Sequence, residues 1–184
     1  FENYPEAFRQ LDFIRTLANS LLITVSSVIV IVIFSAMAAY ALERIKSKFS
    51  TVTFMVFVAA MLVPFQSVMI PLVALFGKAQ MLNQIGIIFM YVGFGGSMSI
   101  FLYHGAMKSI PRPLDEAAII DGASRWQVFW KVIFPMLKPT TVTVAVLNTM
   151  WIWNDYLLPS LVINSPTTQT IPLKVFFFFG QYTK

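Results

Sequence analysis

Long apolar runs alternate with short polar segments along the 184-residue chain. A transmembrane helix needs about 20 mostly apolar residues to cross the hydrocarbon core of a bilayer. Four runs reach this length, at about residues 19–42, 52–76, 85–107 and 140–158. The pattern predicts an all-α membrane protein, a polytopic helical bundle with four transmembrane helices. No internal repeat and no linker divides the chain, so residues 1–184 are expected to form a single transmembrane domain.

The charged segment between the third and fourth runs predicts two short helices. In the first helix, Pro113 fits the starting position, where its missing N–H costs nothing. The helix is expected to reach about Asp121, and Gly122 then ends it, with a positive φ. Its first turn carries two carboxylates, Asp115 and Glu116, which the helix dipole favours at that end.

The second short helix is predicted from a capping box and a proline. Ser124 and Gln127 have the S-x-x-Q spacing in which each side chain caps the other's backbone N–H. The helix is expected to end near Ile133, because Pro135 cannot continue it.

The first short helix has small side chains between its charged ends. Ala117 and Ala118 would allow another protein's backbone to approach closely, while Glu116 and Asp121 add fixed charge at the two ends. This combination predicts a stiff helix that docks into a groove on a partner. An ordinary amphipathic helix lying on the bilayer is the alternative.

Composition indicates a bilayer rather than water as the solvent. The chain is 58% hydrophobic and 11% charged, whereas soluble domains carry about 25% charged residues. It has no Cys and a single His, His104, which is interpreted as an interfacial residue rather than a proton relay. We therefore expect no disulfide, no metal site and no catalytic residue. The net charge of +5 is attributed to membrane topology rather than to nucleic acid binding.

The basic residues divide unequally between the two sides of the predicted bundle. The loop after the first run and the segment from Lys108 to Lys138 carry eight, and the other side carries five. The positive-inside rule then makes residues 109–138 cytoplasmic and leaves both ends of this piece of chain outside. Residues 175–179 are apolar but too short to span, and Pro166 and Pro172 precede them, so we expect an interfacial or packed segment on the outer side.

Polar residues within the apolar runs mark a candidate solute pathway, because polar groups are costly in lipid. In the fourth run, Asn148, Trp151 and Asp155 fall on one helix face and could offer a sugar an amide, an indole and a carboxylate. The alternative is that the Trp is an interfacial belt residue and the Asn joins two helices.

Two further features lie in the second and third runs. In the second run, Gln66 is a further candidate for the solute pathway. Pro64 and Pro71, on either side of it, predict a kink that forms a gate, or a kink that only serves packing. In the third run, the small pair Gly95 and Ser99 predicts close helix packing.

The residue order of the charged segment resembles the cytoplasmic signature of ABC importer permeases. That signature reads E-A-A, three residues, G, nine residues and I-x-L-P. The matching residues are Glu116, Ala117, Ala118, Gly122 and Pro135, while Val132 and Phe134 replace the Ile and the Leu. The resemblance continues over nearly the whole chain, through stretches such as "AAYALERIKSKF", "SIPRPLDEAAIIDGAS" and "WNDYLLP", and is strongest to the carbohydrate-uptake branch.

The resemblance implies a function, a set of partners and a larger subunit. Members of this branch have six spans, so the first and last spans would be missing here. The E-A-A helix would couple the permease to two ATPase subunits, which bind the ATP and Mg, and this chain would bind no cofactor. A second permease, an external solute-binding protein and a bacterial or archaeal membrane are implied as well. A permease for an amino acid or phosphate is the nearest alternative, followed by an ion-coupled transporter and, last, a membrane-embedded enzyme.

Overall fold

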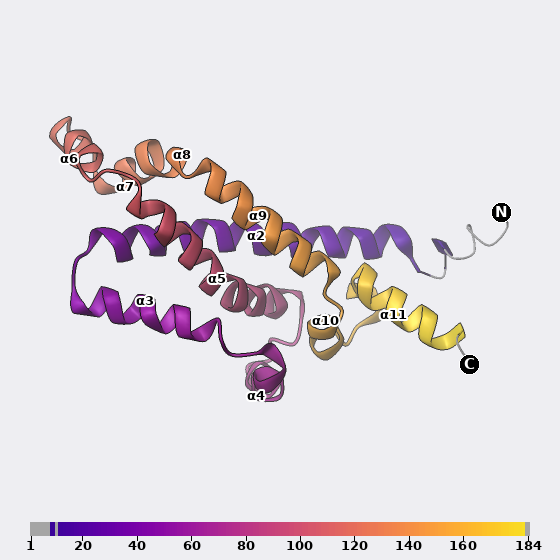
Figure 1. Ribbon diagram of the computed structural model, residues 1–184. Helices are drawn as coiled ribbons and strands as arrows, with labels where there is room; N and C mark the ends of the chain where they lie inside the picture. The colour runs from indigo at the N-terminus through magenta and orange to yellow at the C-terminus, as the bar shows by residue number, and fades with distance from the viewer. Residues whose placement is uncertain (1–7, 10, 183–184) are drawn as a thin grey trace. The chain divides into compact units, whose positions relative to one another are not determined.

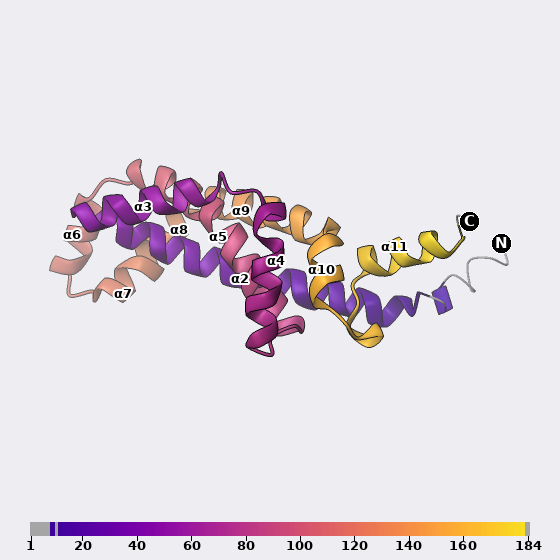
Figure 2. The same ribbon diagram turned by 90° about the horizontal axis from the view of Figure 1, so that it is seen from below.

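The computed structural model describes residues 8–9 and 11–182, and every regular element within them is helical. The all-α prediction is therefore confirmed (Figures 1 and 2). The chain forms two compact units. The first unit contains the chain up to Val28, residues 64–91 and the chain from Thr149, and the second contains residues 29–63 and 92–148.

Among the described residues, two single helices are long and apolar enough to cross a membrane, and two bent helix pairs would raise the number to four if each pair is one span. α2 (Phe13–Arg44) contains the first predicted run and extends it at both ends. α5 (Gln84–Lys108) agrees with the third run within about a residue at each end. Both are uninterrupted because neither contains a proline and their apolar residues run through every turn.

The second predicted run is two helices rather than one. α3 (Lys48–Ala60) and α4 (Phe65–Lys78) are separated by a non-helical break, so the kink predicted in this run is a full break of the helix at Pro64. The break comes directly before α4, where Pro64 has an extended backbone, φ −68° and ψ 137°. Proline lacks an N–H and disfavours helical geometry in the preceding residue, which accounts for the break. Pro71, by contrast, lies inside α4 without interrupting it.

The fourth predicted run also ends earlier than expected. α9 (Lys138–Asn154) stops before residue 158, and a separate helix, α10 (Leu157–Val162), follows. The Asp155 side chain accepts a hydrogen bond from the Leu157 N–H at 2.9 Å. A side chain that captures a nearby backbone N–H competes with the helix ladder, and this explains the interruption.

The charged segment folds into α6 (Pro113–Ile120), α7 (Arg125–Val128), the π-helix η1 (Phe129–Ile133) and α8 (Phe134–Met136). The predicted end near Ile133 is wrong, because the chain stays helical past Pro135. In the π turn, the Phe134 N–H donates to the Phe129 carbonyl, five residues back. The wider turn leaves Pro135 at the start of α8, where no N–H is required. The helical stretch Arg125–Met136, formed by α7, η1 and α8, then meets α9 (Lys138–Asn154) at a bend of 76°.

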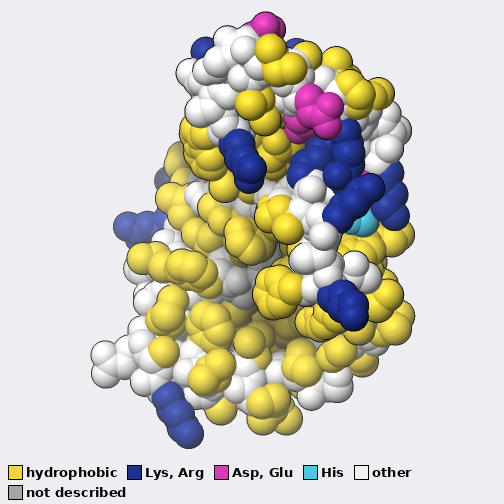
Figure 3. Space-filling model, turned by 90° about the vertical axis from the view of Figure 1, so that its left-hand side faces the viewer, with side chains coloured by type: hydrophobic (Ala, Val, Ile, Leu, Met, Phe, Trp, Pro, Cys, Tyr) yellow, Lys and Arg dark blue, Asp and Glu magenta, His cyan; other side chains and the backbone are white. Residues whose placement is uncertain are grey.

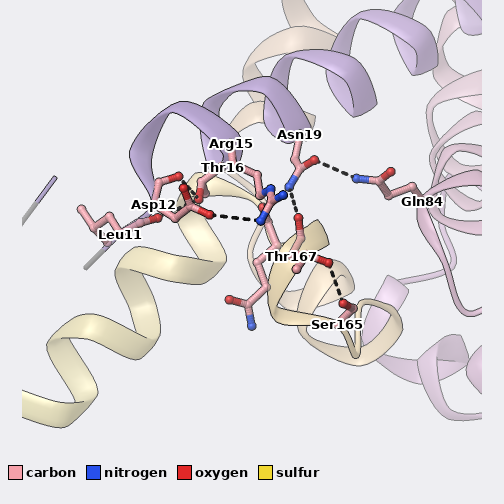
Figure 4. A network of polar contacts seen from close by, with 9 residues as sticks. Leu11, Asp12, Arg15, Thr16, Asn19, Gln84, Ser165 and Thr167 are labelled. Carbon is pink, nitrogen blue, oxygen red and sulfur yellow. Dashed lines mark hydrogen bonds and ion pairs between the residues drawn. The ribbon is translucent and has the colours of Figure 1, made fainter. Parts of the chain in front are cut away.

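The end of the described chain is packed rather than free. The short helix η2 (Pro166–Thr168) leads into α11 (Ile171–Tyr182), with Pro172 in its first turn. The Ile171 N–H donates to Ser20 Oγ on α2 at 2.8 Å, and the side chain of Leu173 is fully buried. Figure 4 shows Asn19 on α2 linked to Thr167 and to Gln84, at 2.9 and 3.1 Å. These contacts hold the segment within the first unit.

Candidate functional site

The signature helix α6 is attached to the second unit by a buried carboxylate. Asp115 lies in its first turn, and Arg44 Nη2, at the end of α2, lies 2.8 Å from Asp115 Oδ2. The Tyr40 hydroxyl donates to Asp115 Oδ1 at 2.9 Å. The Asp115 and Arg44 side chains are only 11% and 12% exposed. Because water is largely excluded, separating the two charges would be costly, so the pair specifies one position of α6 on α2.

A second set of contacts holds the turn before α6. Arg112 Nη2 donates to the Glu43 backbone carbonyl at 2.6 Å and lies 3.6 Å from the Glu43 carboxylate. The other Glu43 oxygen is 3.2 Å from His104 Nε2 on α5. His104 is buried and stacks on Phe54 of α3, with ring centroids 3.9 Å apart. Three helices therefore converge on one cluster of charged side chains.

The opposite face of α6 is open to solvent. Glu116 and Ala117 are exposed, Ala118 is half-buried, and Asp121 and Gly122 are exposed at the end of the helix. The side chain of Ile120, next to Asp121, is 85% exposed, so a large apolar group lies on the surface among polar residues. The exposed face of α6 thus carries small side chains, the Glu116 carboxylate near its start and the apolar Ile120 near its end. The contacts of Asp115 hold the helix in place within the second unit.

The predicted caps of this segment are confirmed. Gly122 has φ +87°, and the Ala123 N–H behind it donates to the Ala118 carbonyl at 3.0 Å. Nothing lies within 4 Å of where a Cβ on this glycine would stand, so its backbone conformation is what requires glycine. Ser124 and Gln127 form both hydrogen bonds of the capping box, at 2.8 and 3.3 Å. Pro135 is exposed on α8.

Two of the candidate pathway residues meet at a tyrosine in the first unit. The Tyr91 hydroxyl on α5 donates to Asp155 Oδ2 at 2.9 Å. Its ring lies edge-on to the Trp151 indole, with centroids 5.4 Å apart. Trp151 is 41% exposed, while Tyr91 is buried. An exposed indole beside a half-buried carboxylate is a suitable surface for a hydroxylated, ring-shaped solute.

Asn148 lies in a different environment, within the second unit. Its amide donates to Ser99 Oγ on α5 at 3.0 Å and to the Val144 carbonyl at 2.8 Å, and the residue is 1% exposed. A Cβ on Gly95 would collide with Asn148 Oδ1, so α5 and α9 approach closely at this glycine. The close packing predicted for Gly95 and Ser99 is confirmed, and Asn148 has the helix-joining hydrogen bond that we gave as its alternative.

Pro64 and Gln66 lie at the start of α4. Both are exposed, as is Pro71 one turn further along. Within the described part of the chain, no hydrogen bond is recorded for the Gln66 side chain. The structure therefore places Pro64 and Gln66 at a break in the backbone and Pro71 inside α4. Their role in a pathway stays a prediction.

The sequence pattern of the family described as "Binding-protein-dependent transport system inner membrane component" matches residues 31–179. The chain belongs to this family. The matched region contains α6, the Tyr91 cluster and Asn148, so every candidate site lies within it. Members of this family are membrane permeases that act in transport.

Three relatives are similar over most of the chain. A "Probable starch degradation products transport system permease protein" of Thermoanaerobacterium thermosulfurigenes is 57% identical over 100% of this chain and 67% of its own length. A "Multiple sugar-binding transport system permease protein" of Streptococcus mutans is 40% identical over 89% of this chain and 61% of its own. A "Melibiose/raffinose/stachyose import permease protein" of Bacillus subtilis is 33% identical over 98% and 66%. The chain spans about two thirds of the length of these relatives.

Sequence reasoning missed most of the cluster that seats α6 in this permease. It used Asp115 only as a helix-dipole residue and read Arg44 and Arg112 only as topology signals. One signal was present: Tyr40 and Arg44 are one helical turn apart, at and just beyond the end of the first apolar run. Their acceptor lies 71 residues from Arg44, however, and nothing local identifies it. Tyr91 was missed for the same reason.

Proposed function

We propose that this chain is a permease subunit of an ATP-driven ABC importer and forms half of a membrane pathway for a sugar or oligosaccharide. The observation that carries the proposal is its similarity, over nearly its whole length, to relatives named for starch products, multiple sugars and melibiose-type sugars. A second homologous permease, two ATPase subunits and an external solute-binding protein complete the transporter. It works as a multi-pass protein of a bacterial or archaeal membrane, with α6 on the cytoplasmic side.

In this proposal α6 couples ATP hydrolysis to transport. Its exposed face, with Glu116, Ala117 and Ala118, enters a cleft on the ATPase subunit, which binds the ATP and Mg. The buried pair of Arg44 and Asp115 passes the movement of the ATPase to α2. Rigid-body rotation of this kind needs a stiff connection, and a buried ion pair with capped helix ends supplies one.

The proposed solute pathway includes Trp151 and Asp155, joined through Tyr91. The indole face would stack on the C–H face of a sugar ring, and the carboxylate would accept its hydroxyl hydrogen bonds. Asn148 contributes by holding α9 against α5. In this proposal the chain bends at the break before α4, beside the exposed Gln66, when the pathway opens and closes.

The test is transport by the full-length subunit with its partner permease, ATPase and binding protein in proteoliposomes. We expect ATP-dependent uptake of starch-derived oligosaccharides or galactosides, and none of amino acids or phosphate. Uptake of an amino acid or phosphate instead would still support an ABC importer, but one for a different class of solute. Uptake driven by an ion gradient without ATP would contradict the proposal and support a secondary transporter.

A further inference from the structure

A basic hollow lies beside the charged cluster, entirely within the second unit. It has a volume of about 580 Å³ and lies between the end of α2, the start of α3 and the end of α5. Four cations line it, namely Lys46, Lys48, Lys108 and Arg112, against a single carboxylate, Glu43. In Figure 3, the dark-blue Lys and Arg side chains gather around the cyan histidine, next to yellow hydrophobic side chains. The coupling proposed above makes no use of this hollow.

The three lysines of the hollow are left without an acidic partner. Glu43 is engaged by Arg112 and by His104. Among the described residues, no carboxylate lies within ion-pair distance of Lys46, Lys48 or Lys108. All three are exposed, so their ammonium groups can reach a ligand in the hollow. Like charges gathered in this way repel one another, and an anion would relieve that repulsion.

The backbone adds donors to the same hollow. α3 starts there, and Ser47, Lys48 and Ser50 of its first turn line the wall. The Ser47 side chain accepts from the Ser50 N–H, while the Lys48 and Phe49 N–H groups have no partner within the helix. A helix start with unpaired N–H groups beside ammonium groups is suited to a phosphate oxygen.

The remaining wall of the hollow is apolar and continues into an exposed apolar row. Phe54 and Met55 line the hollow itself. Along the same helix, Val52, Met55 and Val56 are about 60% exposed, at spacings of three and four residues. A free phosphate ion would use only the basic end. A phospholipid would use both, with its phosphate among the lysines and its acyl chains along α3.

We propose that this hollow is a binding site for the headgroup of an anionic phospholipid, with Lys46, Lys48 and Lys108 as its phosphate ligands and α3 as the wall for the acyl chains. Its volume is in the range of small-ligand sites, about 300–1,000 Å³. Basic pockets between transmembrane helices commonly bind such headgroups. The site joins α2, α3 and α5 at the point where they support α6, so a bound lipid would brace the base of the coupling helix.

The test compares lipid preference of the full-length permease in nanodiscs. Spin-labelled phosphatidylglycerol and spin-labelled phosphatidylcholine report how strongly each lipid is retained at the protein surface. We expect a preference for phosphatidylglycerol, lowered at least about fivefold when Lys46, Lys48 and Lys108 are all changed to Gln, since one interfacial lysine contributes about that factor. The same three positions changed to Arg should retain the preference.

The matched control removes the same charge elsewhere, by changing Lys78, Lys131 and Lys138 to Gln. An equal loss of preference in this control would show that only diffuse charge attracts the lipid, and would overturn the site. Inorganic phosphate should not displace the labelled lipid. Displacement by phosphate at constant ionic strength would identify a free-anion site and would also overturn the proposal.

Discussion

At the base of α6, one carboxylate accepts from two side chains of another helix. Asp115 is bound by Arg44 and by Tyr40, and all of its partners lie more than 70 residues away in sequence. An ion pair buried in this way contributes less net stability than its geometry indicates, because both charges lose their hydration. Its main effect is to specify one position for α6.

The first prediction tests this pair. Asp115→Ala should lower the free energy of unfolding by about 3–5 kcal/mol, because it leaves Arg44 buried without a partner. The double variant Arg44→Met with Asp115→Ala should cost clearly less than the sum of Asp115→Ala and Arg44→Met alone. Denaturant unfolding in detergent micelles, followed by circular dichroism, measures all three. Additive costs would mean that the two residues do not interact.

The second prediction concerns the approach of α5 to α9. Gly95→Ala should destabilise the permease by about 1–3 kcal/mol, because its new methyl group meets Asn148 and lies 2.8 Å from Ile31 Cδ1. Gly96→Ala is the control, since nothing lies within 4 Å of its Cβ position. The same unfolding measurement should separate the two variants, and equal costs would contradict the close approach.

The third prediction concerns the solute pathway. Asp155→Asn and Trp151→Ala should each lower solute uptake, while subunit assembly and basal ATP hydrolysis stay nearly unchanged. Tyr91→Phe, which removes only the hydroxyl that binds Asp155, should produce a smaller loss in the same direction. Uptake assays in proteoliposomes decide the matter. Normal uptake in the first two variants would leave these residues with a packing role.

Among the elements, α6 is the one that local sequence determines most completely. Pro113 at its start, Gly122 at its end and the following capping box all act through the backbone within a few residues, so each could be predicted. The break before α4 and the π-helix before Pro135 could not be placed in the same way. A proline predicts that a helix is disturbed. Packing decides whether the helix breaks, as at Pro64, or takes one extra residue into a π turn, as before Pro135.

The fourth prediction belongs to α6 as an element. Gly122→Leu forces a left-handed backbone at a cost of about 1–2 kcal/mol, and Ala118→Leu and Glu116→Lys alter the exposed face. All three should weaken co-purification of the ATPase and reduce solute-stimulated hydrolysis, while membrane insertion continues. Gly122→Asn tolerates positive φ and should be much milder. If all three variants keep the ATPase and normal stimulation, α6 is an ordinary loop helix.

At the scale of the whole molecule, the sequence predicted the class of protein and missed how its parts are joined. Low charge and apolar runs were enough for an all-α membrane protein. The contacts that seat α6 and that bring Trp151 and Asp155 to Tyr91 join segments far apart in sequence. Contacts of this kind depend on the packed fold, which no local pattern encodes.

The fifth prediction is the orientation of the chain in its membrane. Residues 1–184 contain no Cys, so labelling needs only that any Cys elsewhere in the full-length subunit is first replaced by Ser. Ile45→Cys and Lys131→Cys should react with impermeant maleimide only in inverted vesicles, and Asn164→Cys only in intact cells. All three native side chains are exposed, so a cysteine at each position is accessible to the reagent. Labelling of Lys131→Cys in intact cells would reverse the orientation.

The Arg44–Asp115 pair that holds α6 also has a consequence during synthesis of the chain, because its two residues are made at different times. Arg44 leaves the ribosome 71 residues before Asp115, which at about 5–20 residues per second is a delay of roughly 4–14 s. During this interval the end of α2 carries an uncompensated guanidinium, which favours the headgroup region over the hydrocarbon. The guanidinium can thus hold the nascent helix at a fixed depth until its carboxylate partner is translated. The guanidinium that later pairs with Asp115 would first serve as a depth marker for insertion.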